Sequence, residues 1–256
     1  MTANLSFGEL SSRVPKLHQG RSHTWGIHPR LAEFLDEQLK PDHVTLETGF
    51  GYSTLVILRK GVARHIAIAP VADELLAIRE FCAGNGIPTA SLEAVARRSQ
   101  DWLPGASLPA LNLVLVDGDH AFPIPFLDWF YTAETLVLGG LMIVDDIHLV
   151  TGRLLADFMD ADPKWERVLY EDMRFAVFRK LKHPVHEGGW TEQPYVVDSR
   201  PVHHVNVVRA APPGPVYKAM AAVYVRLPHS AQVLYRHLRS RLREKVSGRV
   251  ERLDAD

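Results

Sequence analysis

The stretch VTLETGFGYST, residues 44–54, decides the fold of this chain. Its first three residues are an apolar run that predicts a β-strand, and the strand ends at the acid Glu47. Gly49 and Gly51 then permit a tight turn that a ligand can approach closely, and a hydroxyl residue such as Ser53 can cap the following helix. Open α/β sheets bind ligands beside strand ends of this kind.

The rest of the chain repeats this alternation of strand and helix. Strands are expected at residues 44–46, 65–69, 91–95, 111–116 and 141–144, and helices at residues 29–39, 54–60, 72–85, 125–138 and 151–160. The run at 111–116 is apolar except for Asn112 and is too continuous for a sheet with one covered face, so both faces must be covered. Two further runs, 165–170 and 175–178, predict an antiparallel hairpin that completes the sheet. The fold class is therefore α/β, a doubly wound and mostly parallel sheet.

Three regions are expected along the chain. Residues 1–40 form an N-terminal helical extension, residues 41–182 form the ligand-binding domain, and residues 183–256 form a helical C-terminal appendage. Leucines at four-residue spacing in this appendage, Leu234 and Leu238 among them, suit packing on the domain or on a second subunit. The appendage is thus the expected site of any homo-oligomer contact.

Composition narrows the class of partner. The chain has 256 residues, 46% of them hydrophobic, and a formal net charge of −1, so no overall field attracts it to nucleic acid. Its only cysteine, Cys82, excludes an internal disulfide and a cysteine-based zinc site. No signal-peptide pattern and no long apolar span is visible, which favours the cytoplasm over a membrane. A small-molecule partner is expected.

The glycine turn also bears on the choice of cofactor. A dinucleotide fingerprint reads G-x-G-x-x-G, and counting from Gly49 its last position is Thr54. An NAD site is therefore the weaker reading. An acid followed by two spaced glycines and a serine instead resembles the first motif of class I methyltransferases, which use S-adenosylmethionine and have a Rossmann-like fold. This resemblance implies that Glu47, Gly49, Gly51 and Ser53 bind that cofactor.

One departure from the family concerns the ribose of the cofactor. Class I methyltransferases usually end the second strand with an acid that binds the ribose hydroxyls, whereas this strand ends in Ala69 and Pro70. Asp73, in the turn that follows, is the replacement that the resemblance suggests. Ser99 lies in the region that flanks the adenine in the family and is expected to contact it.

Acids also end the fourth and fifth strands. VDGDHAF places Asp117 and His120 after the fourth strand, and IVDDIH places Asp145 and Asp146 after the fifth. Parallel strands present their carboxyl ends at one edge, so these side chains should share a crevice with Glu47. Close carboxylates repel one another unless a cation joins them, and oxygen ligands with open positions suit Mg²⁺ or Mn²⁺.

A closer resemblance rests on these residues. Metal-dependent O-methyltransferases of the catechol type have an aspartate at the fourth strand end, an acid followed by Asp or Asn at the fifth, and a basic catalytic residue three positions after the first aspartate. The resemblance implies that Asp117, Asp145 and Asp146 bind Mg²⁺, that Asp117 also serves the cofactor, and that His120 is the catalytic base. A histidine at this spacing resembles the macrolide sugar O-methyltransferases, whereas the catechol enzymes use lysine.

The expected function is metal-assisted O-methylation of a hydroxylated small molecule, such as a sugar or a glycosylated metabolite. Three alternatives remain open at this point: a Rossmann-type NAD-dependent oxidoreductase, a non-catalytic nucleotide-binding module, and a methyltransferase that needs no metal. Thr54 disfavours the oxidoreductase, and the grouping of Asp117, His120, Asp145 and Asp146 disfavours the inert module.

Overall fold

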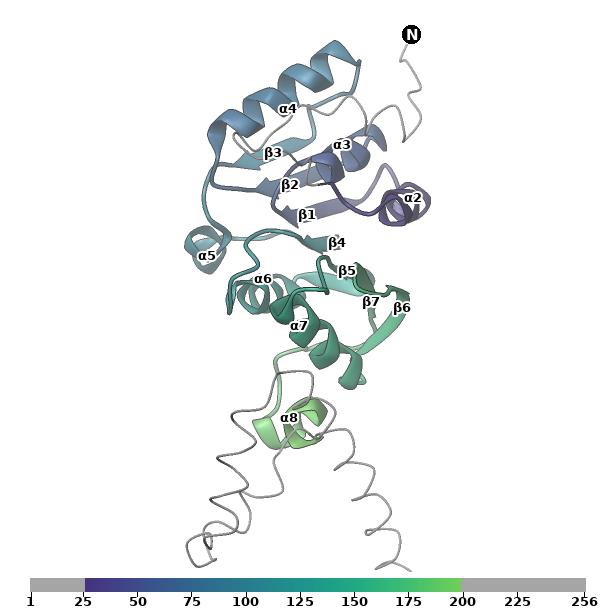
Figure 1. Ribbon diagram of the computed structural model, residues 1–256, viewed down its shortest axis with the longest axis vertical. Helices are drawn as coiled ribbons and strands as arrows, with labels where there is room; N and C mark the ends of the chain where they lie inside the picture. The colour runs from purple at the N-terminus through teal and green to yellow at the C-terminus, as the bar shows by residue number, and fades with distance from the viewer. Residues whose placement is uncertain (1–25, 199–256) are drawn as a thin grey trace, which may run out of the picture. The chain divides into compact units, whose positions relative to one another are not determined.

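A computed structural model describes residues 26–198, which belong to one compact unit. Its centre is a seven-stranded sheet with the strand order β3-β2-β1-β4-β5-β7-β6, which Figure 1 shows. The first five strands of the chain are parallel, whereas β7 pairs antiparallel with both β5 and β6. The predicted mostly parallel α/β sheet with a terminal antiparallel hairpin is therefore confirmed.

The strands and helices alternate along the chain. The strands are β1 (Val44–Thr48), β2 (Arg64–Ile68), β3 (Leu92–Val95), β4 (Leu111–Val116), β5 (Leu136–Val144), β6 (Trp165–Glu171) and β7 (Phe175–Lys180). The α-helices are α2 (Pro29–Gln38), α3 (Tyr52–Arg59), α4 (Ala72–Gly84), α5 (Ser99–Trp102), α6 (Ile124–Ala133), α7 (Val150–Ala161) and α8 (Pro194–Asp198), and the 3₁₀ turns are η1 (Leu103–Gly105) and η2 (Trp190–Glu192).

Two hydrophobic cores cover the two faces of the sheet. Residues of α2, α3 and α4 pack with Leu113 and Leu115 of β4 on one face. Residues of α6 and α7 pack with Val114 and Val116 of the same strand on the other face. Side chains alternate along a strand, so a strand buried on both faces is apolar on both. This explains the apolar run Leu113–Val116 of β4, whereas Asn112 near its start is partly buried and accepts the backbone N–H of Val44 at 2.8 Å.

The order of the strands places the candidate site. The chain moves outward from β1 to β3 and then returns to β4, so the direction of winding reverses between β1 and β4. The registers Thr48 with Val116 and Val116 with Val144 bring the ends of β1, β4 and β5 level with one another. Ligands of doubly wound sheets bind outside the strands at such a reversal.

Most predicted boundaries of helices and strands agree with the structure to within one or two residues. One boundary of a helix and one boundary of a strand do not. The helix predicted at 125–138 ends at Ala133, and β5 begins at Leu136 rather than at residue 141. Gly139 and Gly140 form an irregularity within this strand instead of preceding it, and Gly139 has a φ of 79°. The short helix α5 was not predicted, because four residues show no helical period.

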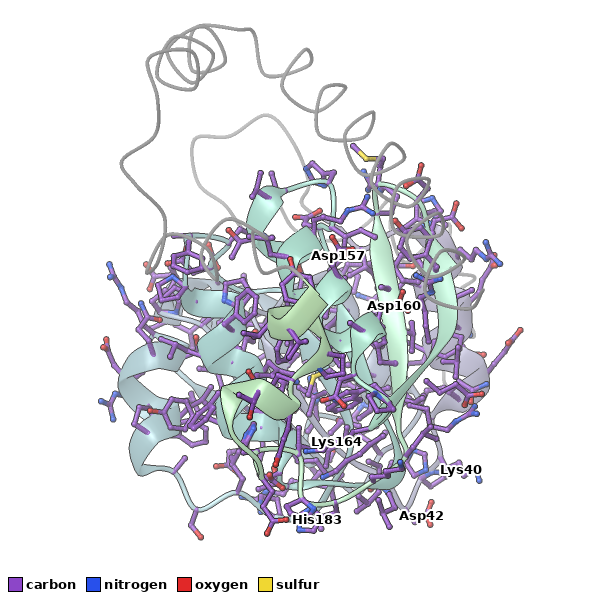
Figure 2. All side chains as sticks on the ribbon, turned by 90° about the horizontal axis from the view of Figure 1, so that it is seen from below. Lys40, Asp42, Asp157, Asp160, Lys164 and His183 are labelled. Atoms are coloured by element: carbon purple, nitrogen blue, oxygen red, sulfur yellow. The ribbon has the colours of Figure 1, made fainter. Side chains whose placement is uncertain are left out.

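The described chain continues beyond Lys182 in contact with the domain. Val185 is buried in the core that α6 and α7 share, and Lys164 donates hydrogen bonds to the carbonyl oxygens of Val185 and Glu187 at 2.8 and 3.2 Å. Lys164 and His183 line one pocket and lie at the same end of the domain in Figure 2. The predicted division at residue 182 stays a prediction, and residues 199–256 of the appendage lie outside the described residues, as does most of the extension at 1–40.

Candidate functional site

Glu47 is buried at the end of β1, with 1% of its surface exposed. Its Oε1 accepts a hydrogen bond from the Thr54 hydroxyl and lies 3.1 Å from Nε2 of His65. The Thr54 hydroxyl in turn accepts the backbone N–H of Gly51 at 2.9 Å. Glu47 therefore stabilises the glycine turn through its hydrogen bond with Thr54. Thr54 occupies the position of the last glycine in a dinucleotide fingerprint.

The two predicted glycines have different structural requirements. Gly49 has a φ of 94°, and a Cβ placed on it would lie 2.4 Å from the carbonyl oxygen of Asp117. Only glycine permits this close approach between the ends of β1 and β4. Gly51 has a φ of 174°, an extended value that other residues also adopt, and it precedes α3 as its N-cap. Ser53 is buried in the first turn of that helix.

Three predicted site residues converge after β4 and β5. One ligand atom from each of Asp117, His120 and Asp146 lies within 4.8 Å of the other two. Backbone hydrogen bonds from Asp117 to Thr48, 3.1 Å, and from Asp145 to Val116, 3.1 Å, continue the ladder of the sheet. These bonds hold both acidic turns against the strand ends.

Asp145 is not part of this group of three. It is 8% exposed, and its Oδ1 accepts the backbone N–H of Asp146 at 2.9 Å. The grouping that the structure presents is thus two acids and a histidine, where the sequence predicts three acids as metal ligands. The role of Asp145 as a ligand stays a prediction.

Asp146 occupies a special backbone position. Its φ is 51°, in the left-handed region that residues other than glycine seldom adopt. In this conformation its Oδ2 lies 3.2 Å from Nε2 of His120 and its Oδ1 lies 3.4 Å from Nδ1 of His148. Strained conformations of this kind are concentrated at functional sites. Asp146 can therefore orient His120 directly.

The charges of the group affect one another. Burial, followed by the nearby charges of Asp145, Asp146 and Glu47, raises the pKa of Asp117 well above its ordinary value. Burial raises the pKa of Asp145 to about 6. The hydrogen bond between His120 and Asp146 raises the pKa of the histidine and lowers that of the aspartate. The group therefore carries an excess of negative charge that a proton or a cation would relieve.

The two residues predicted to contact the nucleoside part of a cofactor differ in burial. Ser99 is 7% exposed and begins α5. Asp73 is exposed in the first turn of α4, whereas its neighbour Glu74 is buried. After β2 the chain runs through Ala69 and Pro70 as the sequence predicts, and Asp73 therefore lies on the helix rather than at the strand end.

Two buried polar residues were missed from the sequence, one at the start of β2 and one on α6. His65 is fully buried on β2 beside Glu47, and Asp128 is fully buried on α6. Burial raises the pKa of Asp128 to about 6, against the opposing effect of the hydroxyls of Ser99 and Thr48. Neither carboxylate oxygen of Asp128 has a hydrogen-bond partner of good geometry among the described residues. In the sequence, the only signal for a buried polar residue of this kind was a single polar residue within an apolar run.

The fold is similar to that of solved methyltransferase structures. A cofactor-bound protein from MTB, Rv0187, is 16% identical, with a TM-score of 0.54 over 62% of this chain and 83% of that chain. A proposed O-methyltransferase from Klebsiella pneumoniae is 16% identical, with a TM-score of 0.53 over 69% and 90%. The O-methyltransferase TomG from Streptomyces achromogenes, involved in tomaymycin synthesis and solved in complex with SAM, is 13% identical, with a TM-score of 0.53 over 69% and 89%.

These likenesses establish the fold, a Rossmann-like methyltransferase fold, and at such identities they establish nothing further. No protein-family model matches the chain, and no curated protein matches its sequence. Among the described residues, no helix is long and apolar enough to cross a membrane.

Proposed function

We propose that this protein is an S-adenosylmethionine-dependent methyltransferase that methylates a hydroxyl oxygen of a small molecule. The observation that carries the proposal is the convergence of Asp117, His120 and Asp146 beside the glycine turn, at the edge where the winding of the sheet reverses. Nucleotide-type ligands bind at this position in doubly wound sheets. The fold shared with SAM-bound TomG supports the choice of cofactor.

Two structural features disfavour an NAD-dependent oxidoreductase. Dinucleotide-binding sheets have the strand order 3-2-1-4-5-6, whereas this sheet has an antiparallel β7 inserted beside β5. Thr54 in the glycine turn also donates a hydrogen bond to Glu47. A dinucleotide fingerprint has a glycine at this position, which permits close packing of the helix on the strand. A non-catalytic module would have no use for a histidine oriented by Asp146 beside a buried acid.

The acidic group has a donor set that fits a divalent cation. Asp117 and Asp146 offer carboxylate oxygens close to one another. Burial and the charges of the neighbouring acids raise the pKa of Asp117, and a cation would neutralise that negative charge. Oxygen ligands suit Mg²⁺ and also Mn²⁺. A bound ion would act as a Lewis acid that lowers the pKa of a coordinated hydroxyl.

The residues then divide the work of methyl transfer. Bound S-adenosylmethionine would supply a methyl group from its positively charged sulfur to the acceptor oxygen, with S-adenosylhomocysteine as the leaving group. His120 in its neutral form accepts the proton of the acceptor hydroxyl at Nδ1, because Nε2 faces Asp146. Such a base contributes about 10²- to 10⁴-fold. Asp146 holds the imidazole in place and stabilises it once it is protonated. Gly49 and Glu47 fix the turn on which the cofactor is aligned with the acceptor.

If no metal binds, the Asp146 and His120 pair retains this chemistry as a general base. The acceptor class that we propose is a hydroxylated small molecule, in particular a sugar or a glycosylated metabolite, since His120 has the spacing of the sugar O-methyltransferases. Nucleic acid is not proposed as a partner, because the chain has a formal net charge of only −1.

Calorimetric titration tests the proposal directly. The full chain is titrated with S-adenosylmethionine and with NAD, each with and without Mg²⁺ or Mn²⁺. We expect S-adenosylmethionine to bind and NAD not to bind, and a divalent ion to be taken up at the acidic group. Binding of NAD alone would refute the proposal. Binding of S-adenosylmethionine with no uptake of either ion would show that the methyltransferase binds no divalent metal.

A further inference from the structure

The buried acid Asp128 lies on α6 among apolar neighbours. Its side chain is fully buried, and Trp129 and Ala133 of the same helix belong to the apolar core against the sheet. A carboxyl group in such surroundings costs free energy unless polar partners receive it. The groups that stabilise its charged form by hydrogen bonding are the hydroxyls of Ser99 and Thr48. Their geometry is not ideal, but among the described residues they are the donors that act on this carboxylate.

Thr48, at the end of β1, connects this acid to the turn after β4. Its side-chain oxygen accepts the backbone N–H of Asp117 at 3.3 Å, and its carbonyl oxygen accepts the same N–H at 3.1 Å. A hydroxyl oxygen that accepts one hydrogen bond still has its own proton to donate. The hydrogen bond of Thr48 lowers the pKa of Asp128, so the hydroxyl is the donor and the carboxylate the acceptor. Thr48 therefore bridges the Asp128 carboxylate and the Asp117 backbone.

The side chain of Thr48 also supports this turn by direct packing. A Cβ placed on Gly118 would lie 3.2 Å from Cβ and 3.3 Å from Oγ1 of Thr48. The backbone that follows Asp117 therefore rests on the Thr48 side chain, which is fully buried. A change in the conformation of Thr48 would move the turn that carries Asp117.

Ser99 brings a second segment to the same acid. It is 7% exposed and is the first residue of α5, the short helix that follows β3. The residue before it, Arg98, makes no side-chain capping hydrogen bond with this helix. The hydroxyl of Ser99 therefore ties the start of α5 to Asp128 of α6. One buried carboxylate thus joins the turn after β4 to the segment after β3.

We infer that Asp128 is a positioning residue, whose buried carboxylate orients the hydroxyls of Thr48 and Ser99 and so holds Asp117 in the acidic group and the start of α5 in place. The inference rests on the proposed function, because a fixed Asp117 serves the binding of a divalent ion. Asp128 acts through the two hydroxyls and touches neither the cofactor nor the acceptor. Replacing residues that orient metal ligands in this way typically lowers metal affinity by about 10- to 100-fold.

Binding of Mn²⁺ to the full-length protein without cofactor tests this role. The dissociation constant is measured calorimetrically near neutral pH for the wild type, Asp128→Leu, Thr48→Val and the double variant. We expect each single variant to bind Mn²⁺ about tenfold more weakly, because Asp117 is no longer held in place. The double variant should bind no more weakly than the weaker of the two single variants, since both remove the same hydrogen bond.

Two control variants separate hydrogen bonding from charge and from packing. Asp128→Asn removes the negative charge but keeps an oxygen acceptor, so it should retain most of the affinity that Asp128→Leu loses. Thr132→Val removes another fully buried hydroxyl of α6, which donates to the backbone carbonyl oxygen of Asp128 at 2.6 Å, and should bind Mn²⁺ as the wild type does. Equal losses in Asp128→Asn and Asp128→Leu, additive losses in the cycle, or wild-type affinity in folded Thr48→Val would overturn the inference.

Amide hydrogen exchange reads the position of the turn without any ligand. In Asp128→Leu and Thr48→Val, exchange at the Asp117 amide should accelerate about fivefold more than exchange at the amides within β4, which report the stability of the whole domain. Thr48→Val supplies this result if Asp128→Leu fails to fold. Equal acceleration at Asp117 and within β4 would overturn the inference. If the exchange pattern is as expected but the wild type binds neither S-adenosylmethionine nor Mn²⁺, the proposed function fails while Asp128 still holds the turn.

Discussion

The pH dependence of turnover tests the role of His120. A base must be deprotonated, and the hydrogen bond from Asp146 raises the pKa of His120 above its ordinary value of 6.5. Without added divalent ion, kcat should therefore rise with pH through a midpoint above 6.5. Asp146→Asn should move that midpoint to lower pH. His120→Ala should lower kcat by about 10²- to 10⁴-fold while the affinity for cofactor changes little.

The measurement is kcat between pH 5.5 and 9 for the three proteins. kcat is expected to rise with pH because the raised pKa favours the protonated imidazole. The imidazole cannot accept the proton of the acceptor hydroxyl until the pH exceeds that pKa. An unchanged kcat in His120→Ala would assign His120 to structure. An unchanged midpoint in Asp146→Asn would show that Asp146 does not determine the pKa of His120.

The sequence predicts that Asp117, His120 and Asp146 lie together, because each follows a parallel strand, and the structure brings a ligand atom of each within 4.8 Å of the others. The strand ends determine this outcome, and strands are visible as apolar runs. His65 and Asp128 were missed because their partners lie on other elements. A sequence pattern carries no signal for such a pairing.

Asp128 predicts how stability depends on pH. Its folded-state pKa of about 6 lies above the ordinary 3.8, so the folded protein holds this proton more tightly than the unfolded chain does. The stability contributed by Asp128 is thus present at low pH and is lost as the pH rises from about 4 through 6. In Asp128→Asn, the difference in unfolding free energy between pH 4.5 and pH 7.5 should change by about 2 kcal/mol relative to the wild type.

Urea denaturation at the two pH values measures this difference. Asp101→Asn, an exposed acid on the neighbouring α5, is the control and should leave the difference unchanged. If Asp128→Asn shows the same difference in unfolding free energy between the two pH values as the wild type, the Asp128 carboxylate is ionised at both.

At the scale of elements, sequence periodicity predicts the long segments and fails at the irregular ones. β4 agrees with its prediction residue for residue, since a largely apolar run that begins after Pro109 and ends at Asp117 is typical of a buried strand. β5 begins five residues before its predicted start, and Gly139 and Gly140 lie within it. The pairing of Leu111 with Leu136 resumes beyond them at Leu113 with Leu141. Glycines mark bulges as well as turns, and only pairing with a neighbouring strand distinguishes the two.

The contact between the ends of β1 and β4 predicts the effect of Gly49→Ala. The new Cβ would meet the carbonyl oxygen of Asp117 at 2.4 Å, and the φ of 94° disfavours any L side chain. Because a backbone atom cannot move aside alone, the strand ends must separate, and we expect a loss of about 3 kcal/mol or more in stability. Cofactor binding should weaken with it.

Gly61→Ala is the matched control for this substitution. Gly61 also has a positive φ, 68°, but a Cβ there would meet nothing within 4 Å. It should therefore show only the backbone penalty of about 1 kcal/mol. Chemical denaturation of both variants isolates the clash as the difference between them, and equal losses would mean that the β1 and β4 ends tolerate a side chain.

At the scale of the whole molecule, the acidic group affects both the stability of the fold and the proposed function. Raised pKa values at Asp117 and Asp145 mean that the ionised carboxylates oppose folding near neutral pH. Anything that neutralises them in the native state alone should stabilise the entire domain, because a domain of this size unfolds cooperatively. The melting temperature of the protein is therefore a sensor for the proposed metal.

Thermal unfolding with and without divalent ion makes this measurable. At an ion concentration of about 100 Kd, Mg²⁺ or Mn²⁺ should raise the melting temperature by about 5 °C, whereas NaCl of equal ionic strength should not. Asp117→Asn should melt higher than the wild type in the absence of ion, since it removes a disfavoured charge, and should lose the response to ion. Equal melting temperatures in both salts would exclude the acidic group as a metal site and leave Asp146 and His120 to act as a base without a metal.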